Sequence, residues 1–121
     1  METNRMEQME ALETMAQFND RLLHNLPTII DELSGGRKAD TDAYLKNIVE
    51  VIGWEISVMN AVSDLLAESG TPRMDKERFN QCVLALNTAL ASGEDAKTAD
   101  ALRGLIPHFE TLAAAAKEVL A

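Results

Sequence analysis

The sequence predicts an all-α protein, an up-down bundle of four main helices built from two helical hairpins. Three observations support this fold class. Apolar residues recur at three- and four-residue spacing along the chain, no segment alternates with a period of two, and glycines at positions 35–36, 70 and 93 separate the helical stretches. With 121 residues, of which 46% are hydrophobic, the chain is expected to form a single domain over residues 1–121.

The first helix is expected over residues 4–33, because its apolar positions keep helical spacing until Ser34-Gly35-Gly36. Pro27 lies inside this segment. A proline lacks an N–H donor and crowds the preceding turn, so we expect a kink or break near Leu23–Leu26. Residues 1–17 are interpreted as an N-terminal arm. This arm carries four of the six methionines, whose flexible thioethers suit an irregular apolar partner.

The second helix, residues 42–66, is apolar on two flanks. At about 100° per residue, its polar side chains fall in one narrow strip. One flank comprises Leu45, Ile48, Val49, Ile52, Ile56, Met59 and Leu66. The other, called the Trp54 flank below, comprises Tyr44, Val51, Trp54, Val58, Val62 and Leu65. A helix with this pattern must be covered on two sides.

The remaining helices form the second hairpin. We expect the second helix to end near residues 68–70, which closes hairpin one at residues 18–68. The third helix is expected to begin at Asp75 and to end at Ser92-Gly93, and the fourth to begin near residues 96–98. Hairpin two is therefore assigned to residues 75–121. The fourth helix contains Pro107, where a second helix break is expected.

The two hairpins align without a gap when Gly93 is laid on Gly36. Ala39 and Thr41 then fall on Ala96 and Thr98, and the core positions match. Either a duplication or an ordinary match between two amphipathic hairpins explains this. The Trp54 flank and the N-terminal arm have no counterpart in hairpin two. We therefore expect the arm to cover that flank, within one chain or across a homodimer, unless a partner helix does so.

The candidate partner-binding residues lie on these two unrepeated features. They are Tyr44, Val51, Trp54, Glu55, Val58, Met6, Met9 and Met15. Glu55 lies between the two apolar flanks, opposite the polar strip. It could be a polar anchor for a partner or a buried acid with a raised pKa. We expect instead that it reaches an edge and pairs with Arg or Lys. Glu55→Gln should then change partner binding only slightly, because an exposed ion pair contributes little free energy.

Composition argues against several classes of function. A net charge of −9 disfavours nucleic-acid and anionic membrane partners. Cys82 is the only cysteine, which excludes an internal disulfide and a cysteine metal cluster. No apolar run approaches the roughly 20 residues of a membrane span, and residues 1–17 lack the apolar core of a signal peptide. A cytoplasmic protein is expected.

The sequence gives little support for catalysis. Asp20 and His24 share a helix face and could hold a metal, but further ligands cannot be placed, and there is no phosphate-binding loop. We therefore expect no enzyme activity, metal or cofactor. A histidine phosphotransfer domain stays a second alternative. The residues after His24 and His108 do not match the leucine, lysine and glycine typical of that class.

Two groups of residues carry a family resemblance. The first comprises Leu33-Ser34-Gly35-Gly36, Ala39, Leu45, Ile48-Val49 and Ile52-Gly53-Trp54-Glu55, and the second Ala99-Asp100-Ala101-Leu102, Ile106-Pro107 and Leu112. Over residues 20–115 the chain resembles small helical proteins that accompany bacterial flagellar genes. The resemblance implies a flagellum-associated protein, such as an export chaperone that shields an apolar helix of a flagellar subunit.

The sequence thus predicts a noncatalytic bundle that binds an apolar helix of a client protein by helix-in-groove packing. A self-assembling structural homodimer, formed through the same flank, is the first alternative.

Overall fold

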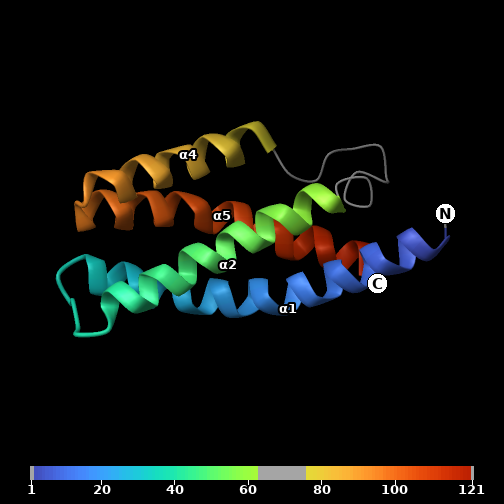
Figure 1. Ribbon diagram of the computed structural model, residues 1–121, viewed down its shortest axis with the longest axis horizontal. Coiled ribbons are helices and arrows are strands. Elements are labelled where there is room, and N and C mark those ends of the chain that lie inside the picture. Colours follow the sequence, from blue (N-terminus) through green and yellow to red (C-terminus); the bar gives the residue numbers. More distant parts are fainter. Residues whose placement is uncertain (1, 63–75, 121) are drawn as a thin grey trace.

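A computed structural model describes residues 2–62 and 76–120, which form four α-helices and contain no strand. The helices are α1 (Glu2–Leu33), α2 (Thr41–Ala61), α4 (Lys76–Ser92) and α5 (Asp95–Leu120). The connections 34–40 and 93–94 lie at one end of the molecule, and the start of α1 and the end of α5 lie at the other (Figure 1). The predicted all-α up-down bundle is confirmed.

One hydrophobic core runs through all four helices. α1 packs against both α2 and α5, and α5 also packs against α4. In the core, the fully buried Phe109 ring meets the Phe79 ring edge-on, with 5.6 Å between centroids. The buried Asn19 side chain donates a hydrogen bond of 3.0 Å to the Phe109 carbonyl oxygen and so ties α1 to α5. Helices α1 and α5 therefore form the centre of the bundle, and α2 lies at its edge.

The predicted helix breaks at Pro27 and Pro107 are wrong, because α1 and α5 continue through both residues. Both prolines are solvent-exposed. The carbonyl groups that lose a donor, those of Leu23 and Arg103, therefore lie on the solvent side, where water can bond them. One missing bond per helix is a small loss against the apolar face that each long helix buries.

The helix ends differ from the expectation mainly at α2. This helix ends at Ala61, and the Val62 N–H caps it with a hydrogen bond of 2.9 Å to the Val58 carbonyl oxygen. The predicted continuation through Leu65 and Leu66, the predicted end at residues 68–70 and the predicted start of the next helix at Asp75 lie outside the described residues. α5 begins at Asp95, just before the predicted start at residues 96–98.

Burial follows the proposed repeat inside the helices, but the backbone conformation differs at the matched glycines. Thr41 and Thr98 are both buried, as are Ile52 and Phe109. The connections differ, however, because residues 34–40 join α1 to α2 and only residues 93–94 join α4 to α5. Gly93 has a φ of 70°, whereas the left-handed glycine of the first connection is Gly35, with a φ of 125°. The sequence match of Gly36 with Gly93 is therefore not a conformational match.

Arg37 joins the two hairpins at this end of the bundle. Its guanidinium group pairs with Asp42 at 2.8 Å and with Asp95 at 2.8 Å, through two hydrogen bonds to the latter. The hydrogen bonds from Arg37 lower the pKa of Asp95, and those to Asp95 and Asp42 raise the pKa of Arg37.

We expect Arg37→Gln to lower the free energy of unfolding slightly, in a salt-dependent manner, because exposed ion pairs are screened. Urea unfolding at low and high salt measures this effect. Since the pKa of Asp95 is lowered, the stabilisation should exist above the ordinary pKa of aspartate and be lost as pH falls. Lys97→Gln is the control, because Lys97 pairs with Glu94, three residues before it in the same hairpin. Equal effects of the two substitutions would contradict a role of Arg37 in joining the hairpins.

Candidate functional site

An aromatic pair lies at the outer edge of the α1–α2 interface. The rings of Phe18 and Trp54 meet edge-on, with centroids 5.1 Å apart and planes at 66°. The Arg21 guanidinium carbon lies 5.6 Å from the centroid of the Phe18 ring. Both aromatic side chains are exposed to solvent, Trp54 by 40%. This pair forms an apolar patch on the surface of the bundle.

A shallow pocket of about 370 Å³ lies against this pair, and we call it the Phe18–Trp54 groove. It is lined by Phe18, Asn47, Glu50, Val51 and Trp54. Helical geometry explains why the Phe18 and Trp54 rings lie at the surface. Phe18 precedes the buried Asn19 and Trp54 precedes the buried Glu55, so each ring is turned by about 100° from the buried stripe of its helix. The groove therefore combines an apolar floor with an acidic and an amide side chain.

Polar contacts hold the start of α2 against the end of α1. The buried Thr41 hydroxyl donates to a Glu32 carboxylate oxygen at 2.7 Å and accepts from the Lys38 N–H at 2.7 Å. The Tyr44 hydroxyl donates to the Asn25 carbonyl oxygen at 3.4 Å. Burial raises the pKa of Tyr44, and the negative charge of Glu32 raises it further. These contacts set the axial register of the α1–α2 interface.

Glu55 is buried and has no hydrogen-bond partner. Its exposure is 0%, and neither carboxylate oxygen is bonded within the described part of the chain. Loss of solvation raises its pKa to about 8. The expectation of an ion pair at an edge is therefore wrong, because Glu55 faces the middle of the interface rather than its rim. The alternative that the sequence left open, a buried acid with a raised pKa, describes this residue.

The N-terminal arm is the first half of α1. Leu12 and Met15 are fully buried in the core, and Met9 is half-buried against it. The Gln8 side chain donates a hydrogen bond of 2.9 Å to the Ala61 carbonyl oxygen, so the arm contacts α2 near its end. Among the described residues, the ring contact of Trp54 is with Phe18, which follows the arm. The arm therefore packs into the core and against the end of α2, while the Trp54 ring stays 40% exposed.

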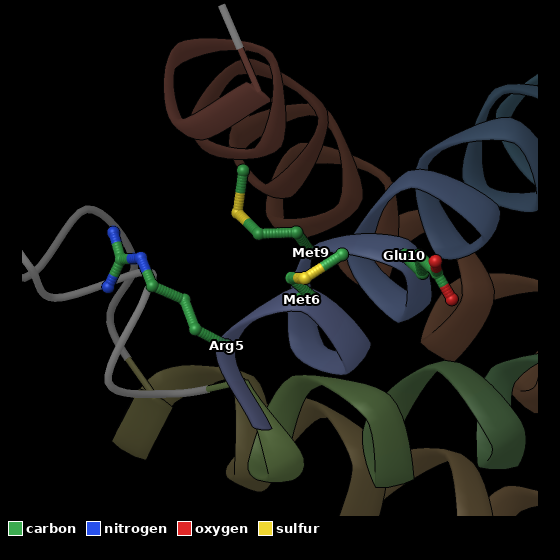
Figure 2. Close-up of a pocket in the computed structure, with 4 residues that line it drawn as sticks. All are labelled: Arg5, Met6, Met9 and Glu10. Carbon is green, nitrogen blue, oxygen red and sulfur yellow. The ribbon is translucent and has the colours of Figure 1, made fainter. Parts of the chain in front are cut away.

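A second pocket, of about 490 Å³, lies on the arm and is lined by Arg5, Met6, Met9 and Glu10. Figure 2 shows the Met9 side chain extended toward the last turns of α5, while Glu10 points away from it. Met6 is 66% exposed. Because Met6 and Met9 are flexible thioethers, this pocket is an adaptable apolar surface.

The structure divides the candidate residues among three places. Val51 and Trp54 line the groove, and Met6 and Met9 line the pocket on the arm. The others lie at the α1–α2 interface or in the core: Tyr44 is half-buried, and Met15, Glu55 and Val58 are buried. The sequence pattern did not single out Phe18. The available signal was an aromatic residue next to the buried stripe of its helix, in a chain with few aromatics.

A Cys–His contact was also missed. Cys82 Sγ and His108 Nε2 lie 3.6 Å apart, and the Phe79 ring meets the His108 ring edge-on. Asp20 and His24, the predicted metal pair, are both exposed. Within residues 5–62 and 77–120, no group of three His, Cys, Asp or Glu side chains is arranged to hold a metal ion.

The chain belongs to the family described as a domain of unknown function (DUF8042), which it matches over residues 10–115. This match includes the Phe18–Trp54 groove and Glu55 but begins after Met6 and Met9. Comparison with curated proteins and with solved structures gave no match. None of the helices in the described ranges is long and apolar enough to cross a membrane.

Proposed function

We propose that this protein is a noncatalytic binding module that takes an apolar helix of a partner protein into the Phe18–Trp54 groove. The exposed aromatic pair carries this proposal. Tryptophan is enriched among the residues that dominate binding energy, and its rigid ring provides a large contact area at a low entropic cost. The chain contains one tryptophan, one tyrosine and three phenylalanines, and two of these five side chains meet at this surface.

The charge of the surface defines the partner further. Glu50 lines the groove, and the whole chain carries a net charge of −9. A partner helix with apolar residues on one face and Lys or Arg beside them would complement both features. The pocket around Met6 and Met9 provides a second apolar surface for a client. A cytoplasmic, flagellum-associated role as an export chaperone or adaptor would use this kind of binding, and that part of the proposal rests on the sequence resemblance.

We expect Trp54→Ala to weaken binding of a synthetic amphipathic helix of leucine and lysine by about tenfold or more, as at a typical hot spot. Phe18→Ala should weaken it too, because it removes the other half of the aromatic pair. Fluorescence anisotropy of the labelled peptide measures the affinity. A scrambled peptide of the same charge but without an apolar face should bind weakly to every variant.

Leu84→Ala is the matched control, because Leu84 is 64% exposed on α4 and has no place in the groove. Equal losses in Leu84→Ala and Trp54→Ala would contradict the proposal, as would failure of the wild-type protein to prefer the amphipathic peptide. Sedimentation of the protein alone tests the homodimer. A dimer that Trp54→Ala dissociates, together with absent peptide binding, would favour self-assembly.

A further inference from the structure

Two buried polar side chains, one wholly and one partly without hydrogen bonds, lie one residue beyond the aromatic pair: Glu55 has no partner among the described residues, and Asn19 bonds the Phe109 carbonyl oxygen of α5 through its amide nitrogen only. Glu55 follows Trp54 on α2, and Asn19 follows Phe18 on α1. Each of these two residues is rotated by about 100° around its helix axis from the aromatic residue before it. Because α1 and α2 run antiparallel, the two rotations have opposite senses, and both side chains point into the bundle. Asn19 is buried, and its Oδ1 atom lacks a hydrogen bond, as do both oxygens of Glu55.

The position of Glu55 is one that hydrophobic packing would normally fill. In the gap-free match of the two hairpins, Glu55 corresponds to Leu112, which is also fully buried. Glu32, the other glutamate that is buried among the described residues, accepts a hydrogen bond from Thr41. Glu55 and Glu32 are both buried, but Glu32 has a hydrogen-bond donor in Thr41 and Glu55 has none in the part of the chain that the structure describes.

Within residues 5–62 and 77–120, no charged side chain forms a hydrogen bond with Glu55 or offsets its burial. On α1, Glu13, Asp20 and Arg21 are exposed, and on α4 so are Glu77 and Arg78. On α5, Glu110 and Lys117 are exposed, and the half-buried His108 contacts Cys82. Accordingly, burial is the only cause of the raised pKa of Glu55. Ionisation in place would leave a buried charge without a partner, which is strongly unfavourable.

We propose that Glu55 is a proton-dependent switch of the α1–α2 interface: the bundle is closed over the neutral acid, and loss of the proton favours a state in which α2 has moved away from α1. α2 is suited to this motion, because it lies at the edge of the bundle while α1, α5 and α4 remain packed together. In the open state the carboxylate gains water and the apolar flanks of α2 become accessible. This inference concerns the bundle itself and does not depend on the proposed partner.

Hydrogen exchange of the full-length protein tests the switch. We expect the protection factors of α2 amides, corrected for intrinsic exchange rates, to fall at least about tenfold between about pH 6 and pH 9, while those of α5 change less. Trp54 is the only tryptophan, so its emission should shift to the red over the same range. In Glu55→Gln and Glu55→Leu, both effects should be absent.

Glu32→Gln is the matched control and should keep the pH response of the wild-type protein, because Glu32 is the buried glutamate that has a donor. The same response in wild type and in Glu55→Gln would overturn the proposal, as would constant protection of α2 in the wild-type protein. If Glu55→Gln does not fold, Glu55→Leu decides. Failure of both variants to fold would also contradict the proposal, because it would show that the carboxyl group supports the closed bundle.

Discussion

Glu55→Leu is expected to raise the free energy of unfolding at pH 7 by on the order of 2–4 kcal/mol, the largest stabilisation that we expect for a single substitution in this chain. The pKa of Glu55 is raised from 4.5 to about 8 in the folded protein. The folded state therefore binds the proton more tightly than the unfolded state. Stability is highest below the ordinary pKa and is lost as pH rises toward 8. Leucine removes this penalty and has a similar volume.

Urea unfolding of both proteins at about pH 5 and pH 8 measures this effect, and the difference between them should widen with pH. Glu32→Leu is the control. It should destabilise the protein, because it removes the acceptor of the buried Thr41 hydroxyl. A Glu55→Leu variant that is less stable than the wild type at pH 8 would show that Glu55 has a stabilising partner.

Leu12→Ala and Met15→Ala are each expected to lower the free energy of unfolding by about 2–5 kcal/mol, because each leaves a cavity in the core. Both side chains are fully buried, although both lie in the segment that the sequence analysis treats as an arm. Met6→Ala should change stability by no more than about 0.5 kcal/mol, because the Met6 side chain is largely exposed.

Thermal or urea unfolding followed by circular dichroism measures all three variants. If Leu12→Ala and Met15→Ala were as stable as Met6→Ala, the N-terminal half of α1 would be an appendage of the bundle. The expected result also changes how a truncation must be interpreted. Removal of residues 1–17 takes two side chains out of the core, so a red shift of Trp54 emission in that fragment would report unfolding rather than an uncovered flank.

The sequence by itself determined the fold class and most of the buried stripe of α1 and α5, whereas on α2 it also predicted a covered flank at Trp54, which is 40% exposed. The positions of Leu102, Leu105 and Phe109 recur at helical spacing, and all three are buried in α5. On α2 the same spacing placed Glu55 between the two apolar flanks, but the expectation drawn from it, an ion pair at an edge, was wrong because Glu55 is fully buried. Whether a side chain lies on the buried face depends on its angle around the helix axis. Within a helix, that angle follows from the residue number alone.

Only the tertiary structure decided which side chains meet. Phe18 reaches Trp54, and Glu55 faces no donor, because the axial register of α1 against α2 brings these levels together. Long-range contacts, such as those between Gln8 and Ala61 and between Tyr44 and Asn25, accompany that register. A helical pattern gives the direction of a side chain but not its neighbour. For the same reason the prolines were misjudged, since tertiary burial of a long helix outweighs one lost hydrogen bond.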